Sequence, residues 1–349
     1  GKPLMIGELG VLPAAKSEQE IWAETPDYFE SYADMAAAKP WVEKTLGDVI
    51  DAGVQLSYWW CYQSDRPMDQ NKLQRFDLTR ERNPELVACI AEANRRLKAK
   101  LSKDLPLPGE VVVVAGRTAF VIPGHTGAGG GNKPWVWYAP TLPRLPGHEE
   151  RWMFERFRDA GIAIAGIDVG ESFGSPAGRA LYAAFYAEMT EVRGYAPKPV
   201  LLGRSRGGLM TLAWAVENPD KVAAFAGVYP VCNVASYPGV AKAAPAYGMA
   251  PEQLQARLAD HNPVDRLAAL AKARVPLFAI HGDSDKVVPL EANSGLMKER
   301  YAALGGTMQL VVPPGQGHNM WQGFFQCREL VDFVITQARR SSSKAGRSP

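Results

Sequence analysis

The 349-residue chain lacks the features that mark several large classes of protein. It holds four cysteines, which are widely scattered (Cys61, Cys89, Cys232 and Cys327) and form neither a C-x-x-C metal-ligand pair nor a disulfide-rich pattern. Its 39 Lys and Arg nearly balance its 37 Asp and Glu, and no basic block with interleaved aromatics occurs. No apolar run is long enough to span a membrane. We therefore expect no nucleic-acid partner, no membrane span, no metal and no organic cofactor.

The composition is that of a soluble globular protein with a substantial core: 46% of the residues are hydrophobic and 22% are charged. The length corresponds to two domains or one large one. The chain opens with Gly-Lys-Pro and not with Met, which suggests a piece of a longer precursor. A signal peptide removed from such a precursor would leave the compartment open, and we expect a secreted or periplasmic protein. The oligomeric state stays open.

Residues 105–340 alternate apolar and amphipathic segments. Strands are expected at 111–114, 118–122, 134–139, 162–168, 199–202, 222–229, 275–280 and 308–312, the first two paired through a turn near Gly116. Helices are expected at 149–160, 175–193, 209–215, 290–304 and 324–338. Strands that are apolar throughout and alternate with helices predict a mostly parallel α/β sheet, covered on both faces, with its strands in sequence order.

Two segments depart from this alternation. Residues 232–272 interrupt it, with a short helix expected at 252–259, and we interpret them as a small cap insertion over the cleft. Residues 341–349 are expected to form a disordered tail.

The motif that organises this domain is Gly203-Arg204-Ser205-Arg206-Gly207. It lies between a buried strand and a helix, which is the setting of a nucleophile elbow, with Ser205 at the tip of a sharp turn. A Cβ atom at Gly203 or Gly207 would collide with the neighbouring strand or helix. The following helix would point its N-terminal amides at the charge that forms when the serine attacks a carbonyl.

Two later segments supply partners for the serine. His281-Gly282-Asp283-Ser284-Asp285 ends a strand, at the sheet edge where open parallel sheets place functional groups. Asp285 is the preferred acid, and Asp283 is the alternative, which would otherwise shape the turn. His318 lies in a glycine-flanked loop after the next strand, whereas His125, His148, His261 and His281 have weaker positions. We therefore predict His318 as the general base.

These segments resemble the α/β-hydrolases, closest to the prolyl-oligopeptidase and dienelactone-hydrolase-like branch. The resemblance implies Ser205 as nucleophile, His318 as base and then acid, and Asp285 as the group that orients the imidazole. It also implies an oxyanion hole made by the backbone N–H of Arg206 and by a second N–H after the third strand. Pro140 has no N–H, so Thr141 is our choice for the second donor.

The side chain of Arg206 has two interpretations. The Ser-Arg elbow resembles that of glucuronoyl esterases, in which this arginine helps to hold the oxyanion, although the lysine that follows the second glycine there is replaced by Gly208-Leu209 here. In the other interpretation, Arg206 and Arg204 pair with acids such as Asp168 or Glu171 and fix the scaffold. Further candidates for substrate binding are Arg204 and two aromatics, Tyr138 and Trp321, which could equally be core residues.

Residues 1–104 resemble the last quarter of a cellulase-like glycoside hydrolase barrel. The resemblance is carried by residues 7–10 and 58–63, and it places Glu8 at the nucleophile position and Trp59 or Trp60 at a sugar subsite. A complete barrel needs roughly 200 residues or more, and a glycosidase needs a second carboxylate. We therefore expect a partial barrel segment in which Glu8 catalyses nothing.

The combined expectation is a serine hydrolase that cleaves carboxylic esters through an acyl-enzyme. Acyl or uronoyl esters on polysaccharides are the expected substrates, because of the glycosidase-like neighbour. One alternative is a peptidase of the prolyl-oligopeptidase type. The other is a non-catalytic glycan-binding protein that uses Trp59 and Trp60.

Overall fold

The computed structural model of the chain describes residues 103–125 and 133–344. The chain divides after Ser102, and the described residues all belong to the second unit, Lys103–Pro349. The interpretation of residues 1–104 as a barrel segment, with Glu8, Trp59 and Trp60, falls outside the described residues except for its last two positions.

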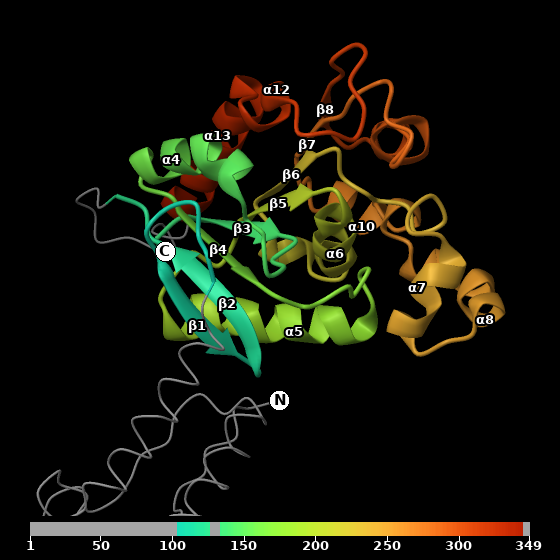
Figure 1. The fold of residues 1–349 in the computed structure, drawn as a ribbon, viewed down its shortest axis with the longest axis horizontal. Helices are drawn as coiled ribbons and strands as arrows, with labels where there is room; N and C mark the ends of the chain where they lie inside the picture. The colour runs from blue at the N-terminus through green and yellow to red at the C-terminus, as the bar shows by residue number, and fades with distance from the viewer. Residues whose placement is uncertain (1–102, 126–132, 345–349) are drawn as a thin grey trace, which may run out of the picture. The chain divides into compact units, whose positions relative to one another are not determined.

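The described unit is built on an eight-stranded, mostly parallel sheet (Figure 1). The strand order is β1-β2-β4-β3-β5-β6-β7-β8. The strands β3 to β8 run parallel, β1 and β2 form an antiparallel hairpin, and β2 pairs antiparallel with β4. The strands are β1 (Glu110–Val114), β2 (Arg117–Ile122), β3 (Trp135–Ala139), β4 (Ala163–Ile167), β5 (Val200–Arg204), β6 (Ala224–Val228), β7 (Leu277–Ile280) and β8 (Met308–Val311).

The expectation of strands in sequence order is wrong at one place, because β4 lies between β2 and β3. Right-handed crossovers explain the exchange. A step from β3 back to β4 puts the connecting helix on one face of the sheet, and the following step forward to β5 puts the next helix on the other face. The reversal is thus what allows helices to cover both faces.

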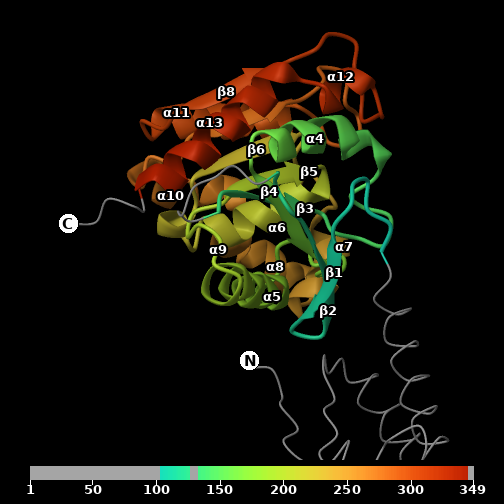
Figure 2. The ribbon, with the colours of Figure 1, turned by 90° about the vertical axis from the view of Figure 1, so that its left-hand side faces the viewer.

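The two faces pack against different helices (Figure 2). In β3, Trp135 and Trp137 belong to one apolar cluster, and Val136 and Tyr138 belong to the other. The first cluster includes residues of α5 (Pro176–Ala187), α6 (Arg206–Ala215), α10 (Ala268–Lys272) and α11 (Leu296–Ala303). The second includes residues of α4 (Arg151–Asp159), α12 (Gln322–Phe325) and α13 (Arg328–Lys344). Shorter 3-10 and π turns are η4 (His148–Glu150), η5 (Glu188–Val192), η6 (Pro219–Lys221), η7 (Pro263–Asp265) and η8 (Glu291–Gly295).

The insertion expected at 232–272 consists of short helices between β6 and β7. They are α7 (Val240–Tyr247), α8 (Pro251–Ala256), α9 (Leu258–His261) and α10. The single helix expected at 252–259 is therefore two helices. A third apolar cluster joins α7 and α8 to Phe173, to Leu209 of α6 and to Val288. A role as a cap over the cleft stays a prediction.

The C-terminal region differs from the expectation in two ways. The single helix expected at 324–338 is broken into α12 and α13, because the backbone of Gln326 leaves the helical region with φ −117°. The first four residues of the tail expected at 341–349 are helical, since α13 continues to Lys344, and the other five fall outside the described residues. The Ser341 hydroxyl lies 3.0 Å from the carbonyl oxygen of Ala338 and 2.9 Å from that of Lys198, which ties this turn to the domain.

Candidate active site

Ser205 lies at a strained turn between β5 and α6. Its backbone has φ 50° and ψ −125°, outside the regions that L-residues favour. The turn closes only because glycines flank it. A Cβ atom on Gly203 would lie 2.6 Å from the Cα atom of Gly208, and one on Gly207 would lie 2.0 Å from the carbonyl oxygen of Ala139. The G-x-S-x-G pattern therefore serves close packing of β5, α6 and the end of β3.

Backbone hydrogen bonds hold this turn to the neighbouring strand. The Ser205 N–H donates to the carbonyl oxygen of Val228 at 3.0 Å. The Ser205 carbonyl accepts from the N–H groups of Gly208 and Val231, at 2.9 and 2.8 Å. The strain at Ser205 is thus offset by contacts on both sides of the turn.

The structure brings Ser205, His318 and Asp285 together in one chain of hydrogen bonds. The Oγ atom of Ser205 lies 2.9 Å from Nε2 of His318, and Nδ1 of His318 lies 2.7 Å from Oδ2 of Asp285. A carboxylate only accepts hydrogen bonds, so the proton of the neutral imidazole is on Nδ1 and Nε2 can accept from the serine hydroxyl.

The carboxylate of Asp285 is fully buried yet well supplied with donors. Its Oδ1 atom accepts from the N–H groups of Val287 and Val288, at 2.9 and 2.8 Å. Burial pushes the pKa of Asp285 up, but hydrogen bonds from His281, His318 and the Val288 amide outweigh it and hold the pKa well below its ordinary value. Asp285 is therefore a stable anion next to the imidazole.

His281 lies beside the Asp285 carboxylate, a role that its place in the sequence does not by itself indicate. Its Nε2 atom lies 2.8 Å from the Val288 carbonyl oxygen and 3.4 Å from Oδ2 of Asp285. Because both are acceptors, Nε2 carries the proton, and Nδ1 accepts from the Ser294 hydroxyl at 2.8 Å. The only sequence signal was its place at the end of a buried strand, directly before the acid loop.

Asp283, the alternative acid, has no hydrogen bond to His318. Its Oδ1 atom accepts from the N–H of Gly315 at 2.7 Å and from the Ser284 hydroxyl at 2.9 Å. It thereby joins the loop after β7 to the loop that carries His318.

Tyr229 packs on the imidazole of His318, with ring centroids 4.3 Å apart. It follows β6 directly and has a positive φ of 35°. Burial raises the pKa of Tyr229 to about 12, so the ring is a neutral wall behind the base. Nothing in the sequence marked this residue beyond its position at the end of a strand.

Arg204 and Tyr138, both candidates for substrate binding, are instead part of a buried cluster around Glu150. The Arg204 Nη1 and Tyr138 hydroxyl groups donate to Oε1 of Glu150, at 2.6 and 2.7 Å. The side chains of Arg204 and Glu150 are 8% and 1% exposed, and Tyr138 is buried too. Arg204 Nη2 also contacts the Met320 sulfur at 2.9 Å. Both side chains are thus enclosed by partners within the protein, and a contact of Arg204 or Tyr138 with substrate stays a prediction.

Arg206 pairs with Glu171, and both side chains are partly exposed. Glu171 is one of the two acids expected to pair with an arginine if Arg206 has a structural role. Arg204 forms its ion pair with Glu150 and not with Asp168 or Glu171. Asp168 accepts instead from the N–H of Gly170, at 2.8 Å.

Trp321 is the one exposed member of the expected substrate-binding set. It is 42% exposed and packs edge-on against Phe324 at the start of α12. It follows the His318 loop directly, so a contact with substrate stays a prediction.

Two backbone N–H groups are available for an oxyanion. Among the described residues, neither the N–H of Arg206, which opens α6, nor that of Thr141 has an acceptor. Thr141 is buried, and its hydroxyl lies 3.4 Å from the Tyr138 carbonyl oxygen. The close packing of Gly207 on Ala139 brings the first turn of α6 beside the segment that contains Thr141.

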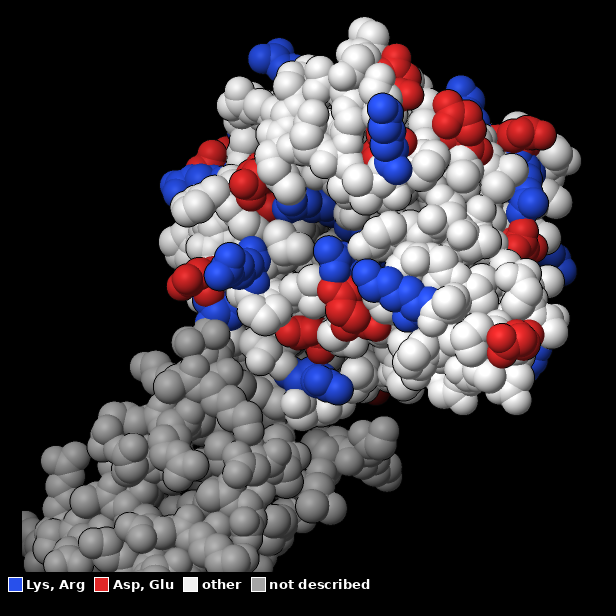
Figure 3. Space-filling view, turned by 45° about the vertical axis from the view of Figure 1, so that its right-hand side comes forward, with Lys and Arg blue, Asp and Glu red and all other residues white. Residues whose placement is uncertain are grey.

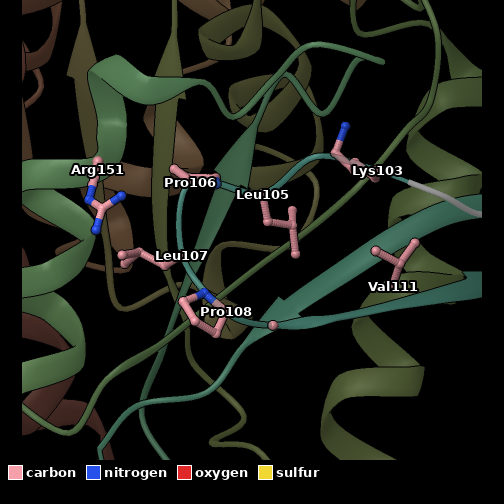
Figure 4. Close-up of a pocket in the computed structure, with 8 residues that line it drawn as sticks. Lys103, Leu105, Pro106, Leu107, Pro108, Val111 and Arg151 are labelled. Atoms are coloured by element: carbon pink, nitrogen blue, oxygen red, sulfur yellow. The ribbon is translucent and has the colours of Figure 1, made fainter.

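Two surface hollows lie near the ends of α4. One, of about 510 Å³, is lined by Lys103, residues 105–109, Val111 and Arg151, and contains none of the site residues above (Figure 4). The other, of about 270 Å³, lies between η4, α4 and α12 and includes Met320. On the face in Figure 3, charges of both signs are interspersed and no broad region carries one sign.

Two further findings concern the described part of the chain. None of its helices is long and apolar enough to cross a membrane. Within residues 103–125 and 133–344, no three His, Cys, Asp or Glu side chains converge as metal ligands would.

The comparison with protein families gives a match in the second half of the chain. Residues 186–335 match the prolyl oligopeptidase family. The matched stretch, which is less than half of the chain, contains Ser205, Asp285 and His318 in that order. A search of the curated proteins found no match.

Solved structures share the fold at low identity. One is a puromycin-hydrolyzing peptidase of Mycobacterium tuberculosis, with TM-score 0.53, 15% identity, and coverage of 67% of this chain and 39% of the other. A second is dipeptidyl peptidase 4 of Porphyromonas gingivalis, with TM-score 0.54, 16% identity, and coverage of 70% and 37%. A third is Est1E of Butyrivibrio proteoclasticus, with TM-score 0.50, 18% identity, and coverage of 67% and 100%. This chain thus spans well under half the length of the two peptidases.

These findings show an α/β fold with a mostly parallel eight-stranded sheet, consistent with an α/β-hydrolase, in which residues 186–335 resemble the prolyl oligopeptidase family. They do not separate peptide from ester substrates. No comparison supports the glycoside hydrolase interpretation of residues 1–104, and the family match starts only at residue 186.

Proposed function

We propose that the chain hydrolyses carboxylic esters through an acyl-enzyme formed on Ser205. The observation that carries this proposal is the hydrogen-bonded chain from Ser205 through His318 to Asp285. It lies where open parallel sheets present functional groups, after the carboxyl ends of β5, β7 and β8.

In the first half of the reaction, Ser205 Oγ attacks the ester carbonyl carbon and its proton passes to His318 Nε2. The negative charge on the carbonyl oxygen is held by the N–H groups of Arg206 and Thr141. The imidazolium is stabilised by the Asp285 carboxylate. When the C–O bond breaks, His318 gives the proton to the leaving alcohol oxygen, and the acyl group stays on Ser205.

In the second half, water replaces the alcohol. His318 Nε2 removes a proton from the water as its oxygen attacks the acyl carbon, and the same N–H groups hold the oxyanion. Collapse breaks the acyl–Oγ bond, returns the proton to Ser205 and releases a carboxylic acid. No further reactant is needed.

Esters are favoured because an alkoxide is a better leaving group than an amide nitrogen. Its departure therefore depends less on proton donation from the His318 imidazolium. Within this class, we propose acyl or uronoyl esters on polysaccharides. The Arg206 guanidinium, 33% exposed beside the nucleophile, supports a uronoyl group, since it could exchange its Glu171 partner for a substrate carboxylate.

A peptidase is the second candidate. It is supported by the match of residues 186–335 to the prolyl oligopeptidase family. The same proton transfers would then deliver the His318 proton to a leaving amine.

Steady-state assays of the full chain separate the two candidates. We expect turnover of p-nitrophenyl acetate and of a 4-O-methyl-glucuronoyl ester, and little turnover of a prolyl-p-nitroanilide peptide. Ser205→Ala should lower kcat by at least about 10³-fold for every substrate. Preference for the anilide would favour the peptidase, and Ser205-independent turnover would contradict both proposals.

A further inference from the structure

We propose that the 270 Å³ pocket between η4, α4 and α12 binds a neutral, hydroxyl-rich alcohol, such as a sugar ring, as the leaving group of the ester. This inference rests on the proposed function. It adds a subsite and the chemistry of the group that fills it.

The proton transfer to the leaving group indicates on which side of the site that group must lie. His318 Nε2 gives its proton to the leaving oxygen, so the leaving group must lie on the side of the site formed by the His318 loop. Met320 belongs to that loop and lines the pocket. The Met320 sulfur also contacts Arg204, the residue before the nucleophile. Met320 also contacts the Tyr229 hydroxyl at 4.0 Å, and Tyr229 packs on the His318 imidazole, so these side chains link the pocket to the base.

The lining supplies polar side chains that are open to solvent and therefore to a ligand. The side chains of His148, Glu149, Gln322 and Gln326 all line the pocket. Within the described part of the chain, none of the four makes a side-chain hydrogen bond or ion pair. Each amide both donates and accepts, and the carboxylate only accepts. A ligand with several hydroxyl groups, each a donor and an acceptor, matches this set.

The remaining lining residues limit the size and charge of the ligand. Trp152 and Phe325 contribute aromatic surface, and the volume lies just below the roughly 300–1,000 Å³ of drug-sized sites, which leaves room for about one ring. Glu155 also lines the pocket but pairs with Arg151 at 2.9 Å, so Glu149 is its uncompensated carboxylate. An acidic alcohol would be repelled there, which favours a neutral one.

The test compares acetate esters that differ only in the alcohol, so that all form the same acetyl-enzyme. The substrates are methyl 6-O-acetyl-glucopyranoside, ethyl acetate, whose alcohol is too short to fill the pocket, and acetylcholine. A pH-stat reports kcat/KM for the full-length protein. We expect the glucoside ester to be preferred over both others.

The variant Glu149→Ala/Gln322→Ala removes two of the polar groups. It should lower the ratio of kcat/KM for the glucoside ester to that for ethyl acetate by about tenfold, mainly through KM, as expected for two lost hydrogen bonds. The matched control Glu252→Ala removes an exposed glutamate on α8 and should keep the wild-type ratio.

The outcomes distinguish a failure of the proposed leaving-group subsite from a failure of the proposed ester hydrolysis at Ser205. An unchanged ratio in the double variant, or a preference for acetylcholine, overturns the subsite while Ser205-dependent hydrolysis stands. Loss of selectivity in Glu252→Ala as well would also overturn it. Absence of Ser205-dependent turnover of all three esters contradicts the proposed function itself.

Discussion

Asp285 combines complete burial with several hydrogen-bond donors, and this has consequences for both activity and folding. The donors include two backbone N–H groups, so part of the acid loop is ordered around the carboxylate. The negative charge also fixes which nitrogen of His318 carries the proton. The Asp285 carboxylate is therefore expected to contribute both to the reaction and to the stability of the fold.

We predict that Asp285→Asn lowers kcat by about 10³- to 10⁴-fold, because an amide can donate to Nδ1 and favour the wrong tautomer of His318. The measurement is kcat for p-nitrophenyl acetate, with circular dichroism to verify folding. A loss below about tenfold would contradict the assigned role.

The lowered pKa of Asp285 also predicts a pH dependence of stability. A depressed folded-state pKa adds stability above the unfolded-state value, near 4, and this contribution is lost as the pH falls through the folded-state value. Urea unfolding should therefore show a difference between wild type and Asp285→Asn that is full at pH 6 and shrinks below pH 4. A difference that stays constant down to pH 2 would contradict this account.

The buried pair of Arg204 and Glu150 gives a prediction on stability alone. Glu150→Gln leaves the guanidinium buried without its counter-charge, which should cost about 3–5 kcal/mol of unfolding free energy. The control is Glu155→Gln, which breaks the exposed pair with Arg151 and should cost about 0–1 kcal/mol. Equal losses in urea titrations would show that the cluster is not enclosed as described.

At the scale of the elements, the turn from β5 to α6 leaves no room for a Cβ atom at Gly207. A Cβ atom at Gly207 would meet the backbone of Ala139, which no side-chain rotation can relieve. The same contact sets α6 against the segment that contains Thr141. A change in the geometry of the turn should therefore also change the geometry of the oxyanion site.

We predict that Gly207→Ala costs at least about 4 kcal/mol of stability or prevents folding, because strand and helix would have to separate. Gly317→Ala is the control, since its Cβ atom would come no closer than 3.5 Å to its nearest neighbour. It should change the unfolding free energy by less than about 1 kcal/mol. Thermal and urea unfolding of both variants check the pair, and a well-folded Gly207→Ala would refute the coupling.

How far the sequence predicts these features depends on the range of the interaction. Ser205, Asp285 and His318 stand in local motifs at strand ends, so the parallel sheet alone is enough to place them at one edge. The pairing of Arg204 with Glu150 could not be predicted, because the partners lie 54 positions apart and meet only when η4 packs over β3. The break before α13 was missed for a similar reason: Phe324 and Phe325 both pack against Tyr229, a tertiary contact that overrides helical spacing.

For the chain as a whole, hydrolysis is proposed to reside in residues 103–344, and Glu8 is expected to have no catalytic role. We predict that Glu8→Gln in the full chain leaves ester hydrolysis at the wild-type rate, and that β-glucans and β-mannans are not cleaved. Reducing-sugar assays beside the ester assay check both statements. Glycan cleavage that survives Ser205→Ala but not Glu8→Gln would contradict them.

The central claim is that His318 activates the hydroxyl of Ser205. Its most direct test is covalent labelling of the full chain with a fluorophosphonate, read by peptide mass spectrometry. We predict one adduct on Ser205, formed rapidly in the wild type and slowed by at least about 10³-fold in His318→Ala. An unlabelled Ser205, or labelling that proceeds equally well without the imidazole, would contradict the account.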